Sequence, residues 1–385
     1  MSYDPTPLRA DEFAWANGGQ VAYLNHAGTG PLPRRTVETL QSWAAIRAEP
    51  WRTPDHSLVF PVLDRTRQLC AKLIGALPAE IALVPNTSHG LNVAARALPI
   101  APGDVVLISD GEFPSTVYVW QSLCRSRGIT THMVPTRDGL LDEEAILRLL
   151  DAPQVKAVTV SWVSFATGYR IDLERLGAEC RARGIYLIVD AVQGLGPAVL
   201  DVNRCAVDFL ACGGHKWLLG PWGTGFLFVR RDLIGSLEPP LVGWLIGPQS
   251  HDYNRLLDYD LRYYEDARRF EMMTLPTQDF AGLSSSIELL LELDPGRIES
   301  HVNALADRII SWAVDQPRVR LVTPRSPSRR AGIVTIALPN APAASERLAG
   351  VGVKHSLREG AIRLSPYCYN TADEIDCALS VLGAS

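Results

Sequence analysis

Short apolar segments alternate with amphipathic stretches through the middle of the chain, and this alternation constrains the fold more than any other feature. The apolar segments are rich in β-branched residues and cover residues 104–109, 155–164, 184–192, 206–213 and 223–230. Segments of this length that are apolar throughout are typical of strands covered on both faces. Between them, residues 171–184 place Leu173, Leu176 and Cys180 on one helical face. The alternation predicts an α/β fold with a mainly parallel sheet flanked by helices.

The pattern changes beyond about Pro276, where a long helical region begins. Two predicted strands around a basic turn follow, and then a strand, a loop and a last helix that Thr371 is suited to cap. This order predicts a smaller α+β domain. We expect an N-terminal arm over residues 1–20, a large domain over 21–280 and a small C-terminal domain over 281–385, to which the N-terminal segment contributes.

The composition is that of an ordinary soluble protein and excludes several classes. Hydrophobic residues make up 47% of the 385 residues and charged residues 21%, and the net charge is −5. This balance does not fit the basic face of a nucleic-acid-binding protein. The seven scattered cysteines include no C-x-x-C pair, which favours buried thiols in a reducing compartment over disulfides or a metal site. Without a signal-peptide layout or a membrane-spanning apolar run, the expected location is cytoplasmic.

The stretch FLACGGHKWLLGPWGTGFLFV, residues 209–229, places Lys216 directly after an apolar strand and among glycines. Glycine allows a sharp turn and lets a flat ligand approach the backbone. An amine held where water is scarce loses its proton more readily and becomes a nucleophile for an aldehyde. Taken alone, the lysine could equally lie on the surface at a strand end.

Other segments supply groups that suit the same ligand. Asp190, in YLIVDAVQ, ends a buried strand, where a carboxylate can keep a pyridine nitrogen protonated. Gln193 follows on the same side and can bond a phenolic oxygen. In ALVPNTSHGLN a helix is expected to begin near Thr87, so that Thr87, Ser88 and His89 offer donors to a phosphate, although an ordinary helix cap would look the same. Phe113 follows another strand and is placed to stack on a ring, or to fill the core.

Together these segments resemble the class-V aminotransferase and cysteine desulfurase superfamily of pyridoxal-phosphate enzymes. The resemblance runs from YLNHAGTGPLP to IRLSPYCYNTADEID, and VDAVQ, GGHKWLLGPWGTGFLFV and REGAIRLSPYCYNT are its most specific parts. It implies pyridoxal 5′-phosphate as the cofactor. It also implies fold type I, which pairs a large cofactor-binding domain with a small C-terminal domain.

The resemblance implies a role for each matching residue. Lys216 would form the Schiff base and move the substrate α-proton, and Asp190 would be the partner of the ring nitrogen. Arg363 would bind the substrate α-carboxylate through its guanidinium fork. The remaining cofactor contacts would be Thr87, Ser88, His89, Phe113, Gln193 and His215. The remaining substrate contacts would be Asn25, His26 and Ala27.

Family members of this type are dimers, so the resemblance also implies a homodimer with shared active sites. Thr274, or Thr277 in its place, would reach the phosphate of the neighbouring subunit. Trp217, Trp222, Trp244, Tyr253, Tyr259 and Tyr263 are possible liners of the substrate pocket, or residues of an interface or core.

The chain departs from the desulfurases at three places. HSLREGAIRLSP has neither the nucleophilic cysteine nor the loop that carries it, and Cys368 lies beyond Arg363. Gly213 replaces a serine that contacts phosphate, and Phe165 replaces an asparagine. A persulfide-forming desulfurase is therefore not expected.

The expected reaction takes place at the Cα of an amino acid through an external aldimine. Aminotransferase or C–S (β-elimination) lyase chemistry is the first expectation, because the chain looks most like the branch with isopenicillin-N-epimerase-like proteins and C–S lyases. Epimerisation and kynureninase-like cleavage are the alternatives, and a non-catalytic scaffold is the alternative of another class. The sequence does not identify the substrate.

Overall fold

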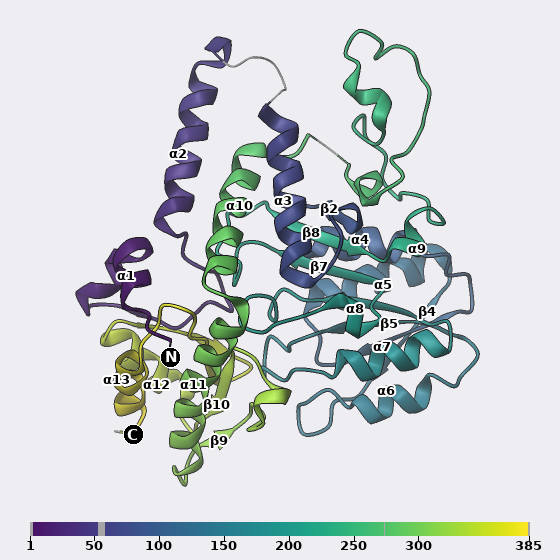
Figure 1. The fold of residues 1–385 in the computed structure, drawn as a ribbon. Coiled ribbons are helices and arrows are strands. Elements are labelled where there is room, and N and C mark those ends of the chain that lie inside the picture. The colour runs from purple at the N-terminus through teal and green to yellow at the C-terminus, as the bar shows by residue number, and fades with distance from the viewer. Residues whose placement is uncertain (1–2, 53–57, 273, 384–385) are drawn as a thin grey trace.

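A seven-stranded sheet forms the centre of the computed structural model, which describes residues 3–52, 58–272 and 274–383 (Figure 1). In spatial order its strands are β2 (Ile81–Leu83), β8 (Gly225–Val229), β7 (Phe209–Gly213), β6 (Tyr186–Asp190), β5 (Val155–Ser161), β3 (Val105–Ser109) and β4 (Thr130–Val134). Strand β8 runs antiparallel to both neighbours, and the other pairs are parallel. The predicted mainly parallel sheet is therefore confirmed, with strands up to a few residues shorter than their apolar segments.

Helices cover both faces of this sheet and explain why its strands are apolar throughout. One apolar core lies under α4 (Thr87–Ala97), α5 (Pro114–Arg127) and α9 (Arg231–Ile234). The opposite core lies under α3 (Val59–Ile74), α6 (Glu143–Leu149), α7 (Leu173–Ala182), α8 (Val202–Cys205) and α10 (Thr277–Glu292). Helix α2 (Arg34–Ala48) packs with α3 against α10 and stands out from the body of the molecule (Figure 1). Alternation of strand and helix thus gives the layered α/β arrangement that the sequence predicts.

A second, antiparallel sheet lies near the C-terminus. Its strands, in order, are β12 (Ser356–Arg358), β13 (Ala361–Leu364), β10 (Val334–Ala337) and β9 (Arg320–Leu321). Helices α11 (Pro295–Val314), α12 (Ala341–Gly350) and α13 (Ala372–Gly383) share an apolar core with it. Thr371 caps α13, since its hydroxyl accepts from the Glu374 N–H at 3.3 Å.

The N-terminal segment contacts this smaller unit, and its Leu8, Phe13 and Ala16 also pack in the large core. After α1 (Thr6–Glu12), strand β1 (Ala22–Tyr23) pairs in parallel with β11 (Val353–Lys354). Leu24 is buried in the small-domain core, and Arg9 forms a 2.9 Å ion pair with Glu374 on α13. Short 3₁₀ helices connect the other elements at η1 (Ala14–Gly18), η2 (Pro50–Arg52), η4 (Pro78–Glu80), η5 (Pro248–His251), η6 (Ala267–Phe270) and η7 (Pro327–Arg329).

The long helical region predicted beyond Pro276 is two helices. The chain turns between α10 and α11 at Asp294, whose φ of 68° lies in the left-handed region. The sequence Asp294-Pro295-Gly296 is a local signal for this break, because Asp294 caps α11 by accepting from the Gly296 N–H at 2.8 Å and a proline suits the first position of a new helix. The prediction of one long helical region overlooked this signal. The expected division at residues 280 and 281 falls inside α10, whose Leu289 and Leu290 pack in the large core. Ile298 and Val302 of α11 pack in the same core, so the boundary at 280 and 281 stays a prediction.

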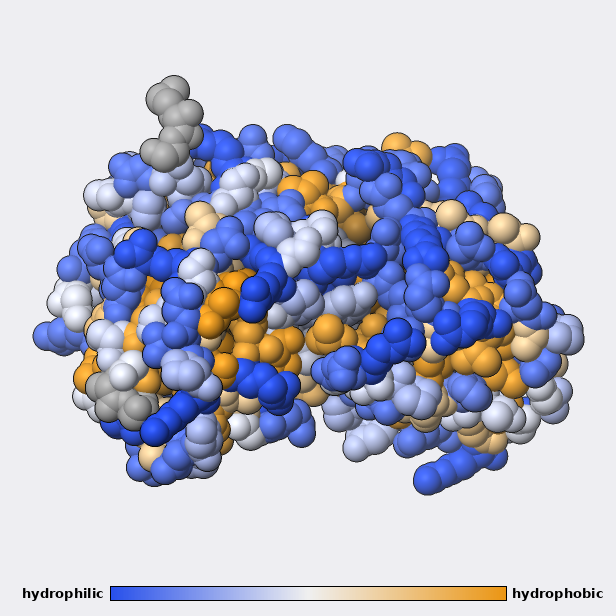
Figure 2. Space-filling model, turned by 90° about the horizontal axis from the view of Figure 1, so that it is seen from below, coloured by the Kyte–Doolittle hydropathy of each residue, from blue (hydrophilic) through white to orange (hydrophobic). Residues whose placement is uncertain are grey.

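Polar and charged side chains cover most of the face that is seen from below, with apolar side chains between them (Figure 2). Among the residues that the structure describes, no helix has the length and apolar character needed to cross a membrane.

Candidate active site

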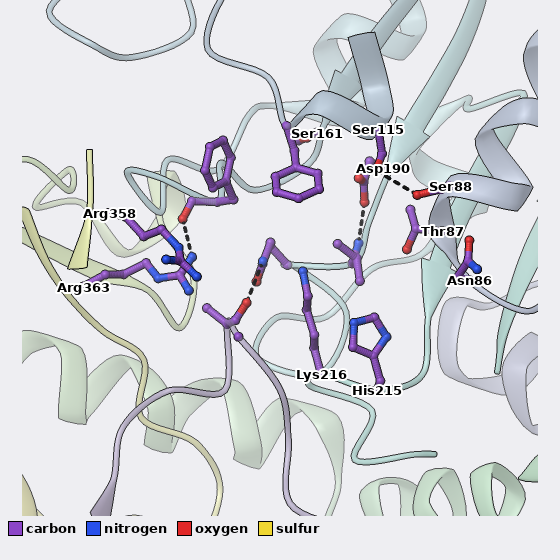
Figure 3. Close-up of a pocket in the computed structure, with 16 residues that line it drawn as sticks. Asn86, Thr87, Ser88, Ser115, Ser161, Asp190, His215, Lys216, Arg358 and Arg363 are labelled. Atoms are coloured by element: carbon purple, nitrogen blue, oxygen red, sulfur yellow. Dashed lines mark hydrogen bonds between the residues drawn. The ribbon is translucent and has the colours of Figure 1, made fainter. Parts of the chain in front are cut away.

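A cavity of about 320 Å³ lies at the carboxyl ends of the parallel strands. Strand β6 ends at Asp190, β7 ends just before the loop with Lys216, and β3 ends just before Phe113, so the topology brings these three predicted residues to one edge. Figure 3 shows Lys216 between two ends of the cavity. Asn86, Thr87 and Ser88 lie at one end, and Arg358 and Arg363 lie together at the other.

The loop that carries Lys216 is held by backbone contacts. Gly214 N–H donates to Thr224 at 2.8 Å, and Gly220 N–H donates to Gly214 at 2.9 Å, which closes the loop on itself. The N-terminal segment braces it, because the Gly30 N–H donates to the His215 carbonyl at 2.9 Å. A Cβ at Gly30 would lie 2.0 Å from the Lys216 carbonyl oxygen, so this close approach requires glycine.

Burial makes the protonated form of the Lys216 amine less stable. It lowers the pKa of the amine below that of an exposed lysine, and Arg363 lowers it further, whereas Asp190 raises it. The cavity therefore holds an amine that is neutral more often than a surface lysine at the same pH, which is the form that attacks an aldehyde.

Asp190 occupies the inner wall. Its Oδ1 accepts a hydrogen bond from the Val192 N–H at 2.9 Å, which fixes the carboxyl against the turn that follows β6. Burial raises its pKa to about 6, while the Val192 bond and Lys216 act in the opposite direction. A buried carboxylate with so few donors is ready to accept a hydrogen bond from a cationic ring nitrogen.

The far end of the cavity is suited to an anion. The first N–H groups of a helix have no intrahelical partners, and Asn86 satisfies only that of His89, from which it accepts at 2.9 Å. The Thr87 hydroxyl accepts from the Gly213 N–H at 2.9 Å. The Ser88 and Ser115 hydroxyls lie 2.8 Å apart and also face the cavity. Burial lowers the pKa of His215 to about 4, so this residue offers a neutral imidazole at the same end.

Arg363 supplies the positive charge at the opposite end. Its Nη1 donates to the Phe165 carbonyl at 2.7 Å and its Nη2 to the Ser356 hydroxyl at 3.1 Å, while the buried Nε has no partner among the described residues. Burial and the neighbouring Arg358 lower its pKa to about 10, so the guanidinium stays charged at neutral pH. No described carboxylate forms an ion pair with it, which leaves the charge available to an acidic ligand.

Gln193 reaches the cavity in a fixed orientation. Its Nε2 donates to the Ala27 carbonyl at 3.0 Å, and its Oε1 accepts from the Trp217 indole at 2.9 Å. One amide N–H remains for a ligand. Trp217 is thus a buried support of Gln193 and does not line the cavity.

Several predicted site residues do not line the cavity. His26 is completely buried among Tyr23, Trp217, Tyr367 and Tyr369, and its Nδ1 lies 3.0 Å from the Ser365 carbonyl oxygen. Asn25 accepts a bond from Ser356 and bridges to the small domain, so only Ala27 of this predicted group faces the cavity. The polar side chain of His26 led to the prediction of a substrate contact, but its imidazole packs among aromatic rings in the core instead.

Two further assignments lie outside the cavity lining. The His89 backbone serves the cap of α4, but its side chain is not among the lining residues. Thr274 lies next to Trp244, whose indole donates to its hydroxyl at 3.4 Å, and Thr277 begins α10. Neither threonine faces the cavity of its own chain.

The structure adds residues that the sequence did not single out for the site. Ser115, Ser161, Val192 and Arg358 all line the cavity, and Phe165, named above as the replacement of an asparagine, lines it as well. Ser161 is a polar residue at the end of an apolar strand segment, which is a pattern that could have identified it. Arg358 ends β12, directly before the turn of the hairpin, and nothing in its local sequence indicates the direction of its side chain.

These residues fit pyridoxal 5′-phosphate. Gly213 leaves a cradle beside the helix N-terminus, since a Cβ there would come within 3.2 Å of both the Thr87 hydroxyl and the His215 Nδ1. Donors for a phosphate, a carboxylate for a ring nitrogen and an amine for an aldehyde surround the same cavity. The fold and the site together define an enzyme of fold type I.

Comparisons with known proteins agree with this class. The family model described as "Aminotransferase class-V" matches residues 22–377. The chain is 30% identical over 382 residues to isopenicillin N epimerase of Streptomyces clavuligerus, with 94% of each chain covered. The apo structure of a cysteine desulfurase from Thermococcus onnurineus NA1 superimposes with a TM-score of 0.87 at 26% identity, covering 100% of this chain and 99% of that one. The chain belongs to the class-V aminotransferase family.

A further structure has the same fold at 23% identity, with a TM-score of 0.87 and coverage of 97% of this chain and 98% of that one. It is a C-DES mutant with glycine covalently linked to its pyridoxal-phosphate cofactor. Family membership indicates pyridoxal 5′-phosphate as the cofactor of this chain and confirms the expectation from the sequence.

Proposed function

We propose that this enzyme acts at the Cα of an amino acid, as an aminotransferase or as a lyase that eliminates a β-substituent such as sulfur. The observation that carries the proposal is the position of Lys216, between the inner carboxylate of Asp190 and the unpaired guanidinium of Arg363. An amino acid whose carboxylate is bound by Arg363 would present its amino group and Cα to this lysine.

Each residue has a proposed task. When bound, pyridoxal phosphate supplies an aldehyde for the substrate amine and a ring that accepts an electron pair from Cα. Thr87, Ser88 and His215 would hold its phosphate, Phe113 and Gln193 its ring, and Asp190 its ring nitrogen. The Lys216 amine, which burial keeps neutral part of the time, would then accept the Cα proton and return it.

Epimerisation is the second candidate, and the match to isopenicillin N epimerase supports it. It differs from transamination and elimination in where the Cα proton returns, while the cofactor and Arg363 would act in the same way.

Persulfide formation is not supported. Strands β12 and β13 join through Glu359 and Gly360 alone, in a hairpin where Arg358 pairs with Ala361, so no loop carries a thiol to the cavity. Cys368 is fully buried, and burial raises the pKa of its thiol well above the usual range.

A panel of amino acids tests the function. We expect the cofactor absorbance to change with some members, and the products to identify the reaction by mass spectrometry and chiral analysis. A 2-oxo acid with aminated cofactor would indicate transamination, an α,β-elimination product would indicate a lyase, and the opposite enantiomer would indicate an epimerase. Cofactor-loaded protein that neither changes its absorbance nor forms a product with any member would refute the proposal.

Replacing Arg363 with lysine should impair substrate binding. A lysine ammonium is a point charge and does not reproduce the bidentate fork, and the loss of one charged hydrogen bond costs about 1.5–3 kcal/mol. We expect KM to rise by roughly 10- to 100-fold, with cofactor occupancy unchanged. Native enzyme that processes amines lacking a carboxylate as well as amino acids would argue against this assignment.

We also propose a homodimer in which each chain completes the other's site. Large side chains are exposed on the protruding segments, with Trp51 and Trp222 each 76% exposed, Leu257 81% and Tyr259 87%. Thr274 or Thr277 would reach the phosphate of the second copy. A fully active monomer, measured by light scattering under assay conditions, would contradict this arrangement.

A further inference from the structure

Glu112 is a carboxylate beside the site to which the proposed reaction gives no task. It lies directly before Phe113, in the turn between β3 and α5. Its Oε1 accepts from the Ser161 N–H at 2.8 Å, and its Oε2 bonds to the Ser161 hydroxyl. No lysine, arginine or histidine of the described residues forms an ion pair with it, and the hydrogen bonds that favour its ionised form come from Ser161 and, more weakly, from the Phe113 backbone.

Ser161 connects this carboxyl to the cavity. It ends β5 and pairs in register with Asp190 at the end of β6. Paired residues on neighbouring strands point to the same face of a sheet, and both side chains line the cavity (Figure 3). Glu112 is therefore bonded to a residue that shares the cavity wall with Asp190, and the two carboxyl groups are near enough for the charge of Asp190 to act on Glu112.

The surroundings of the two carboxyl groups differ. Asp190 accepts from the Val192 N–H and faces the amine of Lys216, and both favour its ionised form. Glu112 has no such cation, and the charge of Asp190 opposes its ionisation. Burial is the largest cause that raises the pKa of Glu112, and the charge of Asp190 raises it as well. The hydrogen bonds from Ser161 lower it, and the resulting pKa is about 7. Neighbouring carboxyls in such unequal surroundings take different protonation states.

We propose that Glu112 is a positioning residue that holds a proton beside Asp190, so that Asp190 alone carries the negative charge that faces the ring nitrogen of the cofactor. This inference rests on the proposed function for the identity of the ring. Glu112 touches neither cofactor nor substrate in this arrangement and acts through Ser161 and Asp190.

Glu112 can exchange its proton with water without crossing the cofactor. It lines a small inner cavity of about 20 Å³ together with Ser161 and Tyr169, and an outer cavity of about 710 Å³ between the two domains. The other charged residues that line the outer cavity are all exposed, and they are Asp110, Asp138, Arg320, Arg358 and Glu359. Their charges are screened by solvent, which leaves Asp190 as the dominant charged neighbour.

The first test is a pH titration of the cofactor absorbance in the loaded enzyme without substrate. Wild-type enzyme should show a transition near pH 7, and Glu112→Gln should lack it, because the amide keeps hydrogen-bonding capacity but does not ionise. Ser161→Ala should move the transition to higher pH, because it removes a donor that lowers the pKa of Glu112. Glu143→Gln is the matched control, since Glu143 is a buried carboxylate bonded to Tyr169 and Arg329 and does not line the site cavity.

The second test uses thermal unfolding of the cofactor-free protein. The folded-state pKa of Glu112 lies above its unfolded value, so its stabilising contribution is present at low pH and is lost as the pH rises to about 7. The melting temperature of Glu112→Gln should therefore fall less than that of wild type over this range. Identical titrations, or identical pH slopes of unfolding, in the two proteins would overturn the inference. Failure of the proposed function would instead appear as absent cofactor binding or absent products, and the unfolding comparison depends on neither.

Discussion

Reduction of the cofactor-loaded enzyme with borohydride is expected to attach the cofactor covalently to Lys216 and to no other lysine. The chain has only four lysines, and Lys72, Lys156 and Lys354 are exposed. Burial lowers the pKa of Lys216, so its amine is neutral more often than the exposed amines at the same pH. Peptide mapping by mass spectrometry would locate the label.

Lys216→Ala should then abolish turnover. General acid–base catalysis by a positioned group contributes roughly 10²–10⁴-fold, and this variant also loses the attachment point of the cofactor. Lys354→Ala is the matched control, because it removes an exposed lysine of the small domain and should leave the rate unchanged. A label on another lysine, or a Lys216→Ala enzyme with near-native turnover, would show that the active amine lies elsewhere.

Asp190→Ala is expected to reduce turnover on the order of a hundredfold or more, which corresponds to about 3 kcal/mol of transition-state stabilisation. The carboxylate should matter most while the ring accepts electrons, because a protonated ring nitrogen strengthens that acceptance. Cofactor binding should change much less, since the phosphate donors of α4 are untouched. Single-turnover measurements on loaded enzyme would separate the two effects.

Two companion variants sharpen the Asp190 experiment. Asp190→Asn keeps the shape and the bond from the Val192 N–H but loses the charge, so it should resemble Asp190→Ala in rate. Asp208→Asn removes another buried carboxylate, which accepts from the Leu187 N–H outside the cavity, and should affect stability more than chemistry. If Asp190→Ala retained the native turnover number, the ring would have to lie elsewhere in the cavity.

The sequence predicted the sheet and the central site residues because their causes are local. An apolar segment long enough for one strand, bounded by turn residues, has few other uses in a soluble protein, and all five such segments correspond to strands of the large sheet. Asp190 ends one strand and Lys216 lies shortly after the neighbouring strand. Because these strands are parallel, their carboxyl ends lie at the same edge of the sheet, and this brings the two residues together. Two glycines around Lys216 are required by crowding, since a Cβ at Gly214 would lie 2.5 Å from the Thr224 hydroxyl oxygen and one at Gly220 would lie 2.5 Å from Leu283 Cδ1.

The remaining features depend on contacts that no local pattern contains. His26 lies in a polar segment that resembles a binding loop, yet four aromatic residues from three parts of the chain enclose it. Glu112 acquires its importance only from Ser161, which is distant in sequence and donates its backbone N–H to the Glu112 carboxylate.

The N-terminal segment makes a mechanical linkage between the small domain and the catalytic lysine. Leu24 is anchored in the small-domain core, and a short stretch later the Gly30 N–H holds the carbonyl of His215, the residue that precedes Lys216. A rigid-body rotation of the small domain would pull on this tether and transmit force to the lysine loop through the backbone. Deletion of residues 1–30 would cut that tether, so a movement of the small domain would no longer reach the lysine loop through this segment of backbone.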